Sequence, residues 1–299
     1  MKKNRKQHLV AAVMAIAALL PACDVRNPIY NTPHPDTGTV TLSTDWSFIG
    51  DGLTAPAQYQ VVIGDFNATF NGMTNALNNQ FPPGMYNLCV YNTPEHIAVE
   101  GTMASVEAAT SPAGQSGTFI HNTPGWLFTA TAPARIEADA HHVFTAVMQQ
   151  QVRQLTLIIE PTGGTTDRIE RIEGYLTGAA SMLDYSNRGH AIHDAPMNVE
   201  LQFARIASGT DAGKWTATVR LLGTAGTEQR LHARIHFTDG SPATITLDSD
   251  LTTALATFNT DKRTPHTLGG RMVETPTEAG FGATITDWTP VNGGEVTAD

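Results

Sequence analysis

One segment decides the fold of this chain: it reads Phe81-Pro82-Pro83-Gly84-Met85-Tyr86-Asn87-Leu88-Cys89-Val90-Tyr91. Its first four residues are typical of a turn, because proline holds φ at about −65° and glycine permits a tight reversal. Tyr86, Leu88 and Val90 then recur at every second position, which places their side chains on one face of an extended backbone. The segment therefore predicts a β-strand that leaves a turn and buries one face in a core.

The same alternation recurs on both sides of this segment and predicts an all-β fold. Asp239-Gly240 lies between two alternating stretches and is the strongest hairpin signal in the chain. Two stretches stay open: the first half of 143–160 fits a helix or a strand, and 169–176 fits a strand or a short helix. The expected strands cover 40–46, 59–63, 86–91, 97–99, 126–136, 155–159, 199–203, 215–221, 231–237, 245–247 and 281–288.

The composition agrees with a folded β-protein that carries a negative charge. Of the 299 residues, 41% are apolar and 15% are charged. This charged fraction is well below the approximate quarter that is usual in soluble domains, which favours β-structure over helices with charged surfaces. The formal charge is −10, from 18 Lys and Arg against 28 Asp and Glu. An acidic surface repels phosphate backbones, so the composition argues against nucleic-acid binding.

Residues 1–22 have the three-part pattern of a secretion signal. Lys2, Lys3, Arg5 and Lys6 precede twelve uncharged residues at 9–20, and Leu20-Pro21-Ala22-Cys23 follows. Twelve helical residues span only ~18 Å, which is too short for a hydrocarbon core of ~30 Å. Ala22 directly before Cys23, with Leu20 three residues before it, resembles a bacterial lipobox. The resemblance implies that Cys23 is acylated and becomes the new N-terminus; the alternative is an ordinary cysteine beside a conventional cleavage site.

Removal of this signal would leave a more acidic chain with a single free thiol. Without its four basic residues the formal charge is 14 − 28 = −14. The second cysteine is Cys89, so a chain acylated at Cys23 has no intramolecular disulfide despite export to an oxidising compartment. Because Cys89 lies within an alternating strand, we expect a small core residue rather than a reactive thiol.

The exported chain is long enough for two cores. Residues 23–37 are rich in proline and show little periodicity, which predicts a short tether between the lipid and the fold. The following ~260 residues are at the limit of what one core accommodates, so we expect two domains. The boundary is placed near Gln149-Gln150-Gln151, which gives an N-terminal β-sandwich at 38–150 and a C-terminal β-sandwich at 151–299.

No catalytic signature is present in the sequence: neither a His-Glu-x-x-His nor a Gly-x-Ser-x-Gly motif occurs, and there is no Cys-x-x-Cys. His190, His193 and Asp194 could supply metal ligands, but no further cluster accompanies them and a loop is the simpler interpretation. We therefore expect a protein that is not an enzyme and that needs no metal or cofactor.

Two further groups of side chains receive structural interpretations. His232, Arg234 and His236 alternate with apolar residues, so we expect them on the solvated face of a strand; the alternative is contact with an anionic glycan or partner. The tryptophans lie on or beside expected strands, where they are most simply core residues, and an aromatic platform for carbohydrate is the alternative. These residues are Trp46, Trp126, Trp215 and Trp288.

The order of several blocks resembles the fimbrillin-like and fimbrial-anchor lipoproteins of Bacteroidota. The first block runs from Thr41-Leu42-Ser43-Thr44-Asp45-Trp46 to Val99-Glu100-Gly101-Thr102 and includes the turn-strand segment at 81–92. The second consists of residues 148–157 and Ile172-Glu173-Gly174-Tyr175-Leu176-Thr177-Gly178. The resemblance runs through most of the chain beyond the signal. It implies two tandem transthyretin-like, Greek-key β-sandwiches in a lipoprotein anchored to the outer membrane and exposed at the cell surface.

The resemblance also implies a function. Members of this family are anchor, stalk or tip components of surface fimbriae that support adhesion, and their subunits join other subunits by strand complementation. The strand implied as donor here is Gly282, Ala283, Thr284, Ile285, Thr286, Asp287 and Trp288, with an ordinary last strand as the alternative. The implied partners are other fimbrial subunits, the outer membrane through the lipid, and host or bacterial surface ligands. A stand-alone glycan-binding surface lipoprotein is the alternative function.

Overall fold

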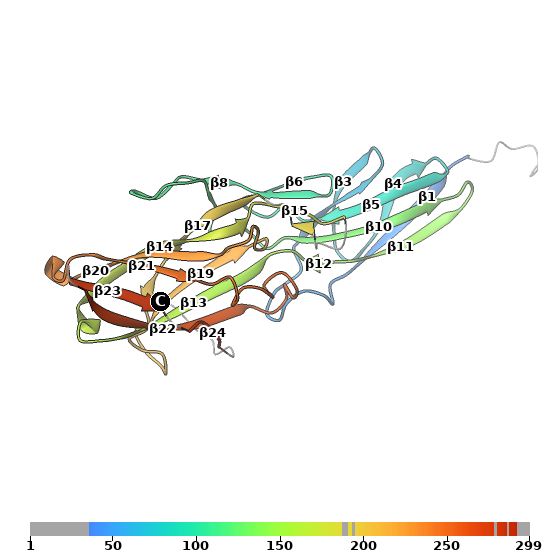
Figure 1. Cartoon of the computed structure of the whole chain (residues 1–299). Helices are drawn as coiled ribbons and strands as arrows, with labels where there is room; N and C mark the ends of the chain where they lie inside the picture. Colours follow the sequence, from blue (N-terminus) through green and yellow to red (C-terminus); the bar gives the residue numbers. More distant parts are fainter. Residues whose placement is uncertain (1–35, 187–190, 193–194, 278–279, 286, 292–299) are drawn as a thin grey trace, which may run out of the picture. The chain divides into compact units, whose positions relative to one another are not determined.

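The computed structural model describes residues 36–186, 191–192, 195–277, 280–285 and 287–291 (Figure 1). The chain divides into two compact units, 1–36 and 37–299, and the fold below is that of the second unit. Its elements are β-strands and short 3-10 turns, which confirms the all-β class. No helix in the described part of the chain has the length and apolar character needed to span a membrane. The expected signal at 1–22, Cys23 and almost all of the tether lie outside the described residues.

The first sandwich encloses one apolar core between two sheets. In the smaller sheet, β1 (Gly38–Asp45) lies between β11 (His141–Val147), to which it is parallel, and β4 (Thr74–Phe81), to which it is antiparallel. Val40 and Leu42 of β1 are almost fully buried, as their alternation predicts. The facing sheet consists, in spatial order, of β12 (Gln149–Gln150), β10 (Phe128–Ile136), β5 (Gly84–Tyr91), β2 (Gln58–Ile63) and β3 (Phe66–Asn71).

The second sandwich repeats this arrangement around a larger core. Here β13 (Arg153–Thr162) lies between the parallel strand β22 (His266–Thr277) and the antiparallel strand β19 (Trp215–Leu221). The sheet continues with β18 (Ala204–Arg205) beside β19, and with β23 (Gly280–Ile285) and β24 (Thr289–Pro290), which both pair with β22. The facing sheet consists of β21 (Ile245–Asp250), β20 (Arg230–Phe237), β14 (Ile169–Ala180), β17 (Pro196–Gln202), β9 (Phe119–Ile120) and β8 (Ala108–Ala109).

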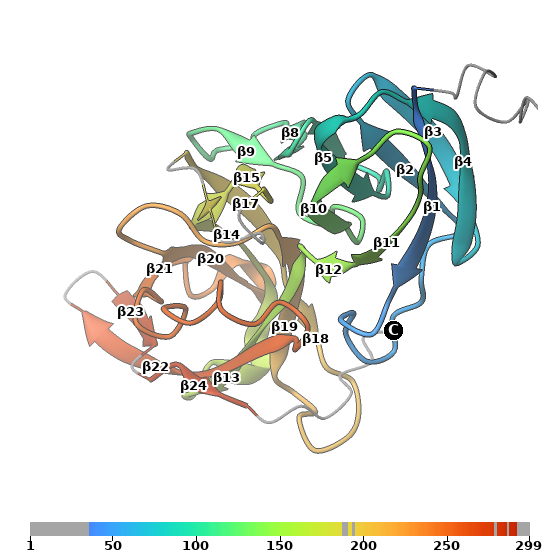
Figure 2. The same ribbon diagram turned by 90° about the vertical axis from the view of Figure 1, so that its right-hand side faces the viewer.

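Seven strands of each sandwich occur in the same order and with the same neighbours (Figure 2). In the first sandwich these are β1, β2, β3, β4, β5, β10 and β11; in the second they are β13, β14, β17, β19, β20, β21 and β22. The first strand of each set pairs in parallel with the last and antiparallel with the fourth. The two halves of the chain are therefore topological repeats, although their sequences show no obvious repeat.

One segment of the first half of the chain, residues 97–127, packs with the second half. It contains β6 (Ile97–Glu100) and β7 (Met103–Val106), and β7 pairs with β15 (Met182–Asp184), itself paired with β16 (Ala191–Ile192). Its apolar side chains pack in the core of the second sandwich; they are Ile97, Ala104, Val106, Ile120 and Leu127. The division of the chain at residue 150 stays a prediction, and the stretch 97–127 packs with residues on the other side of it.

The two stretches whose sequence fits either a helix or a strand are strands in the structure. Residues 141–147 form β11, and the whole of 169–180 forms β14. The hairpin expected at Asp239-Gly240 joins β20 to β21, with φ values of 60° and 62° that glycine tolerates and aspartate occasionally adopts. Gln150 and Gln151, at the expected boundary, are buried: the Gln150 side chain donates to the carbonyls of Val152 at 2.8 Å and Lys262 at 2.6 Å.

Candidate functional site

The C-terminal hairpin contains the strand that the sequence marks as a donor. β23 pairs antiparallel with β22 and is the last strand of its sheet in the described part of the chain, with Val273 opposite Thr284 and Glu274 opposite Ala283. Ala283 and Ile285 face the second core, while Thr284 is exposed. An edge strand with one apolar face is the kind of element that strand exchange uses, because its outer backbone groups are unpaired in the sheet.

The residues after β23 are only partly strand. Thr286 lies outside the described residues, and Asp287 and Trp288 follow β23 without belonging to it. The Trp288 indole donates a hydrogen bond to the Ser249 hydroxyl of β21 at 2.9 Å. Gly270 of β22 leaves space for this ring, since a Cβ there would lie 2.7 Å from Ile285 Cγ2 and 3.0 Å from the indole. The segment expected as a donor therefore closes the second sandwich of its own chain.

The first strand of the fold is held on both sides. β1 pairs with β11 over seven residues and with β4 on its other edge, and its inward side chains belong to the first core. No Lys or Arg occurs between Arg26 and Arg135, so β1 and the strands directly after it contain no basic residue. The first sandwich of this chain keeps its own β1 in the structure.

His232, Arg234 and His236 of β20 lie beside carboxylates of neighbouring strands in the same sheet. His232 Nδ1 lies 2.9 Å from Asp248 Oδ2, and His236 Nε2 lies 2.9 Å from Glu173 Oε1. Burial would raise the pKa of Glu173, but the hydrogen bond and charge of His236, with Arg171 and Arg234 nearby, lower it. The alternation of β20 places these side chains opposite the buried apolar set, as the sequence predicts.

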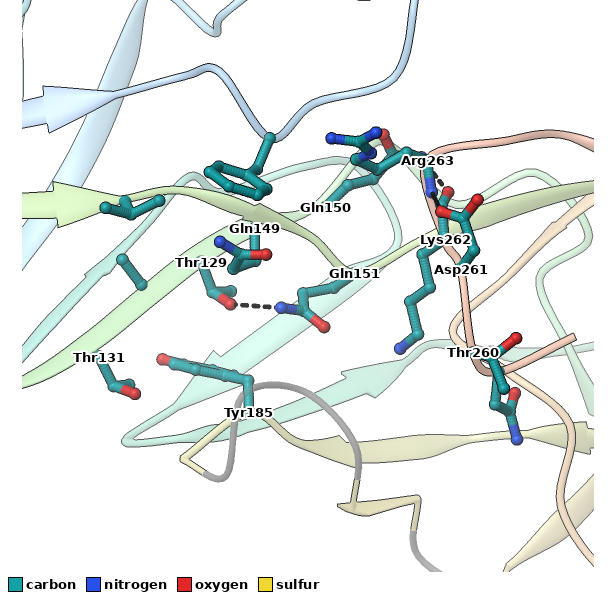
Figure 3. Close-up of a pocket in the computed structure, with 14 residues that line it drawn as sticks. Thr129, Thr131, Gln149, Gln150, Gln151, Tyr185, Thr260, Asp261, Lys262 and Arg263 are labelled. Carbon is teal, nitrogen blue, oxygen red and sulfur yellow. Dashed lines mark hydrogen bonds between the residues drawn. The ribbon is translucent and has the colours of Figure 1, made fainter. Parts of the chain in front are cut away.

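A pocket lies at the junction near Gln149-Gln150-Gln151 and has a volume of about 790 Å³ (Figure 3). Lys262 extends into it from the segment before β22, with Gln151 and Tyr185 across the cavity. The Lys262 side chain is only 9% exposed, and burial lowers its pKa to about 7. Burial likewise raises the pKa of Tyr185, whose hydroxyl donates to the Gly101 carbonyl. The lining is mostly amide and hydroxyl groups and includes the Phe48 side chain.

The other residues singled out from the sequence have structural surroundings. Cys89 is buried, and its burial raises the thiol pKa, in keeping with a core residue. Trp215 is buried, and Trp46, Trp126 and Trp288 are half-buried against the cores. His190, His193 and Asp194 lie outside the described residues. Within the described residues no group of three or more His, Cys, Asp or Glu is placed to hold a metal ion.

The fold defines an all-β protein of two sandwiches with one topology. The family model of the fimbrillin-A associated anchor proteins Mfa1 and Mfa2 matches residues 54–293. The chain belongs to this family. Membership gives it a fimbrial or adhesion-related role at the cell surface or envelope, with protein partners, in a family that is structural rather than catalytic.

Solved structures with the same fold come from Porphyromonas gingivalis and from species of Bacteroides. The fimbrial anchor protein Mfa2 from Porphyromonas gingivalis is 13% identical with a TM-score of 0.53, and 85% of this chain and 97% of that chain are covered. A candidate adhesin from Bacteroides ovatus is 17% identical with a TM-score of 0.57, covering 80% and 90%. One from Bacteroides thetaiotaomicron is 12% identical with a TM-score of 0.52, covering 87% and 99%. These identities show the fold alone. No curated protein matches this chain.

Sequence reasoning missed the cavity and the open edge of β11. Lys262 stands in the polar run Thr260-Asp261-Lys262-Arg263, which resembles an exposed loop and gives no sign of burial. The sequence pattern of β11 fits a helix as well as a strand, so it does not predict a sheet edge there. A usable signal was the run Val143-Phe144-Thr145-Ala146-Val147, which has high β-propensity and no charge.

Proposed function

We propose that this protein is an outer-membrane lipoprotein that serves as the anchor or an accessory stalk or tip subunit of a fimbria. It is held by acyl chains on Cys23 and joined to neighbouring subunits by strand complementation. The observation that carries the proposal is the terminal strand β23, which lies at the edge of its sheet and presents Ala283 and Ile285 to an apolar core. The same alternation would suit a groove in another subunit.

The retained β1 favours an anchor or accessory role over that of a cleaved shaft subunit. In the family that the chain belongs to, the resemblance implies that shaft subunits lose an N-terminal piece by cleavage after an exposed basic residue. The basic residues nearest to β1 in this chain are Arg26 and Arg135, which lie before and well beyond the strand. Acylation at Cys23 would keep residues 24–37 as a tether to the membrane, because two or more acyl chains give stable anchoring whereas one binds only marginally. The proposed place of the protein is therefore the membrane end or a branch of the fibre.

Substituting Cys23 tests the anchor. Cys23→Ala should abolish incorporation of radiolabelled palmitate and move the protein from the membrane fraction to the soluble fraction, because the thiol is the proposed attachment point. Cys89→Ala is the matched control, since Cys89 is buried in a strand and should leave labelling unchanged. Labelling that persists in Cys23→Ala would contradict lipidation at this residue.

Substituting Ala283 tests the strand. Complexes from the native host should run as large species in unboiled extracts and collapse to about 30 kDa on boiling, as strand-complemented assemblies resist detergent. Ala283→Asp should remove these species, because it puts a charge on the apolar face of β23. Thr284→Asp puts the same charge on the exposed face and should leave them intact.

Deletion of residues 282–299 removes the whole segment, including Ala283 and Ile285 of the second core. The deletion should also remove the heat-sensitive species if this segment is the donor. If the deletion leaves assembly unchanged, the segment is an ordinary last strand. If the wild-type protein shows only a small band in both lanes, strand complementation itself is wrong.

A further inference from the structure

The second sandwich contains a strand whose counterpart is missing from the first. β23 lies beside β22, the seventh strand of its set, and also packs against β21, the sixth. There the Ser249 hydroxyl of β21 donates to the Ile285 carbonyl of β23 at 3.5 Å. In the first sandwich the seventh strand is β11 and the sixth is β10, and among the described residues β11 pairs only with β1. β12 pairs with Phe128 and Thr129 at one end of β10, and beyond these residues the seam between β10 and β11 is open where the equivalent seam is closed.

The hydrogen bonds of β1 show which backbone groups of β11 face this seam. The Met148 N–H donates to the Asp45 carbonyl at 2.8 Å, and the Thr39 N–H donates to the Ala140 carbonyl at 2.9 Å. In a parallel pair, alternate residues direct both backbone groups to the same neighbour. The even-numbered residues of β11 thus face β1. His141, Val143, Thr145 and Val147 direct their N–H and C=O groups to the free edge.

The two borders of the seam differ in how they resist pairing. β10 carries Pro133 at a position whose backbone faces outward, and proline has no N–H to offer an added strand. β11 has no proline, lysine or carboxylate, and its Val143 side chain is 65% exposed. Proline and charge are the usual devices that prevent edge pairing, so β11 is the border that lacks protection.

A cavity of about 180 Å³ lies along this seam, between β10 and β11. It reaches the first core through Leu88 and Ala146, which are almost fully buried. In the second sandwich the corresponding space receives Ala283 and Ile285 of β23. The cavity is therefore suited to small apolar side chains on one face of an added strand. Its lining consists of Leu88, Ala130, Thr131, Ala132, Thr145, Ala146 and Val147.

We propose that the outer edge of β11 accepts the terminal strand of a neighbouring fimbrial subunit, while β1 remains in its own sandwich. The incoming strand has alternating small apolar side chains, as β23 does, and occupies the place beside β11 that β23 occupies beside β22. This inference rests on the proposed function, since it assumes assembly by strand complementation. The inference identifies the outer edge of β11 as the acceptor position on this chain. An acceptor at this edge does not require cleavage of the chain before β1.

The test uses proline on two edges of one sheet of the full-length protein in its native host. Val143→Pro removes an outward N–H from β11 without touching its bonds to β1. Ala76→Pro is the matched control on β4: the Thr44 N–H donates to the Met73 carbonyl at 2.8 Å, so Ala76 lies at an outward position of the opposite edge. Val143→Pro should reduce the heat-sensitive complex by about tenfold or more, and Ala76→Pro should leave it at the wild-type level.

A photo-crosslinking amino acid at Thr145 gives a second reading that does not depend on tolerance of proline. It should trap a neighbouring subunit, and the same probe at Ala76 should trap none. The β11 acceptor would be overturned if Val143→Pro formed the heat-sensitive complex at the wild-type level. It would also be overturned if only the probe at Ala76 gave cross-links. Either result would leave the proposed function in place. Absence of any heat-sensitive complex in the wild type would overturn both.

Discussion

Arg153→Met is expected to lower the melting temperature by roughly 6–12 °C, which corresponds to about 3 kcal/mol. Arg153 is 6% exposed at the start of β13 and holds the segment that leads into β22. Its guanidinium donates to the carbonyls of Thr264 at 2.7 Å, Phe258 at 2.7 Å and Thr257 at 3.3 Å. It also lies over the Phe258 ring, 5.1 Å from its centroid. Methionine fills similar volume but leaves these carbonyls without their charged donor.

Arg135→Met provides the matched control for this prediction. The Arg135 side chain is 74% exposed, and its ion pair with Glu137 at 3.2 Å lies in solvent. Such surface pairs contribute between about 0 and 1 kcal/mol, so its melting temperature should stay close to wild type. Thermal unfolding followed by circular dichroism measures both variants. Equal, small shifts in the two would show that the segment before β22 does not depend on Arg153.

Lys262→Met is expected to raise stability at neutral and lower pH, with the gain lost in alkali. Burial places the folded pKa of Lys262 at about 7, against about 10.4 for the unfolded chain. Below pH 7 the amine is protonated in both states, and the folded state bears a desolvation cost for the buried charge. Between about 7 and 10.4 only the unfolded state holds the proton, so wild-type stability rises with pH. The linked free energy is at most about 5 kcal/mol.

The measurement is the melting temperature of wild type and Lys262→Met between pH 6 and 10. Asp261, Arg263 and Tyr185 also line the cavity, so the difference between the two proteins, rather than either curve alone, reports on Lys262. Lys214→Met is the control, because Asp211, 2.8 Å away, raises the pKa of Lys214 and its removal should not stabilise the protein. A difference that is flat with pH would contradict titration of Lys262 in this range.

The candidate sites were unequally visible in the sequence. The alternation in 281–288 marked the terminal strand, and the structure has β23 at Gly280–Ile285. The sequence does not show that β11 has a free edge, because a strand is an edge strand only when no other strand lies beside it in the folded sheet. Burial of Lys262 was also hidden, since a short polar run is buried only where other segments close over it. Both depend on contacts between residues that are far apart in the chain.

The sequence by itself determined many of the strands, the faces they bury and the family. These follow from local properties: a period of two sets the inward face, proline and glycine set the turns, and the order of blocks identifies the relatives. Phe66–Asn71, Thr74–Phe81 and His266–Thr277 are strands of the structure that are not among the expected ones. The tertiary structure decided which strands are neighbours. β1 pairs with β11 across about a hundred residues, as β13 does with β22, and 97–127 packs in the second core. A local sequence pattern cannot specify which strands pair, because a strand with one apolar face could pair with several other strands. The pairing is decided when the two cores form and exclude water from the apolar side chains of both sandwiches.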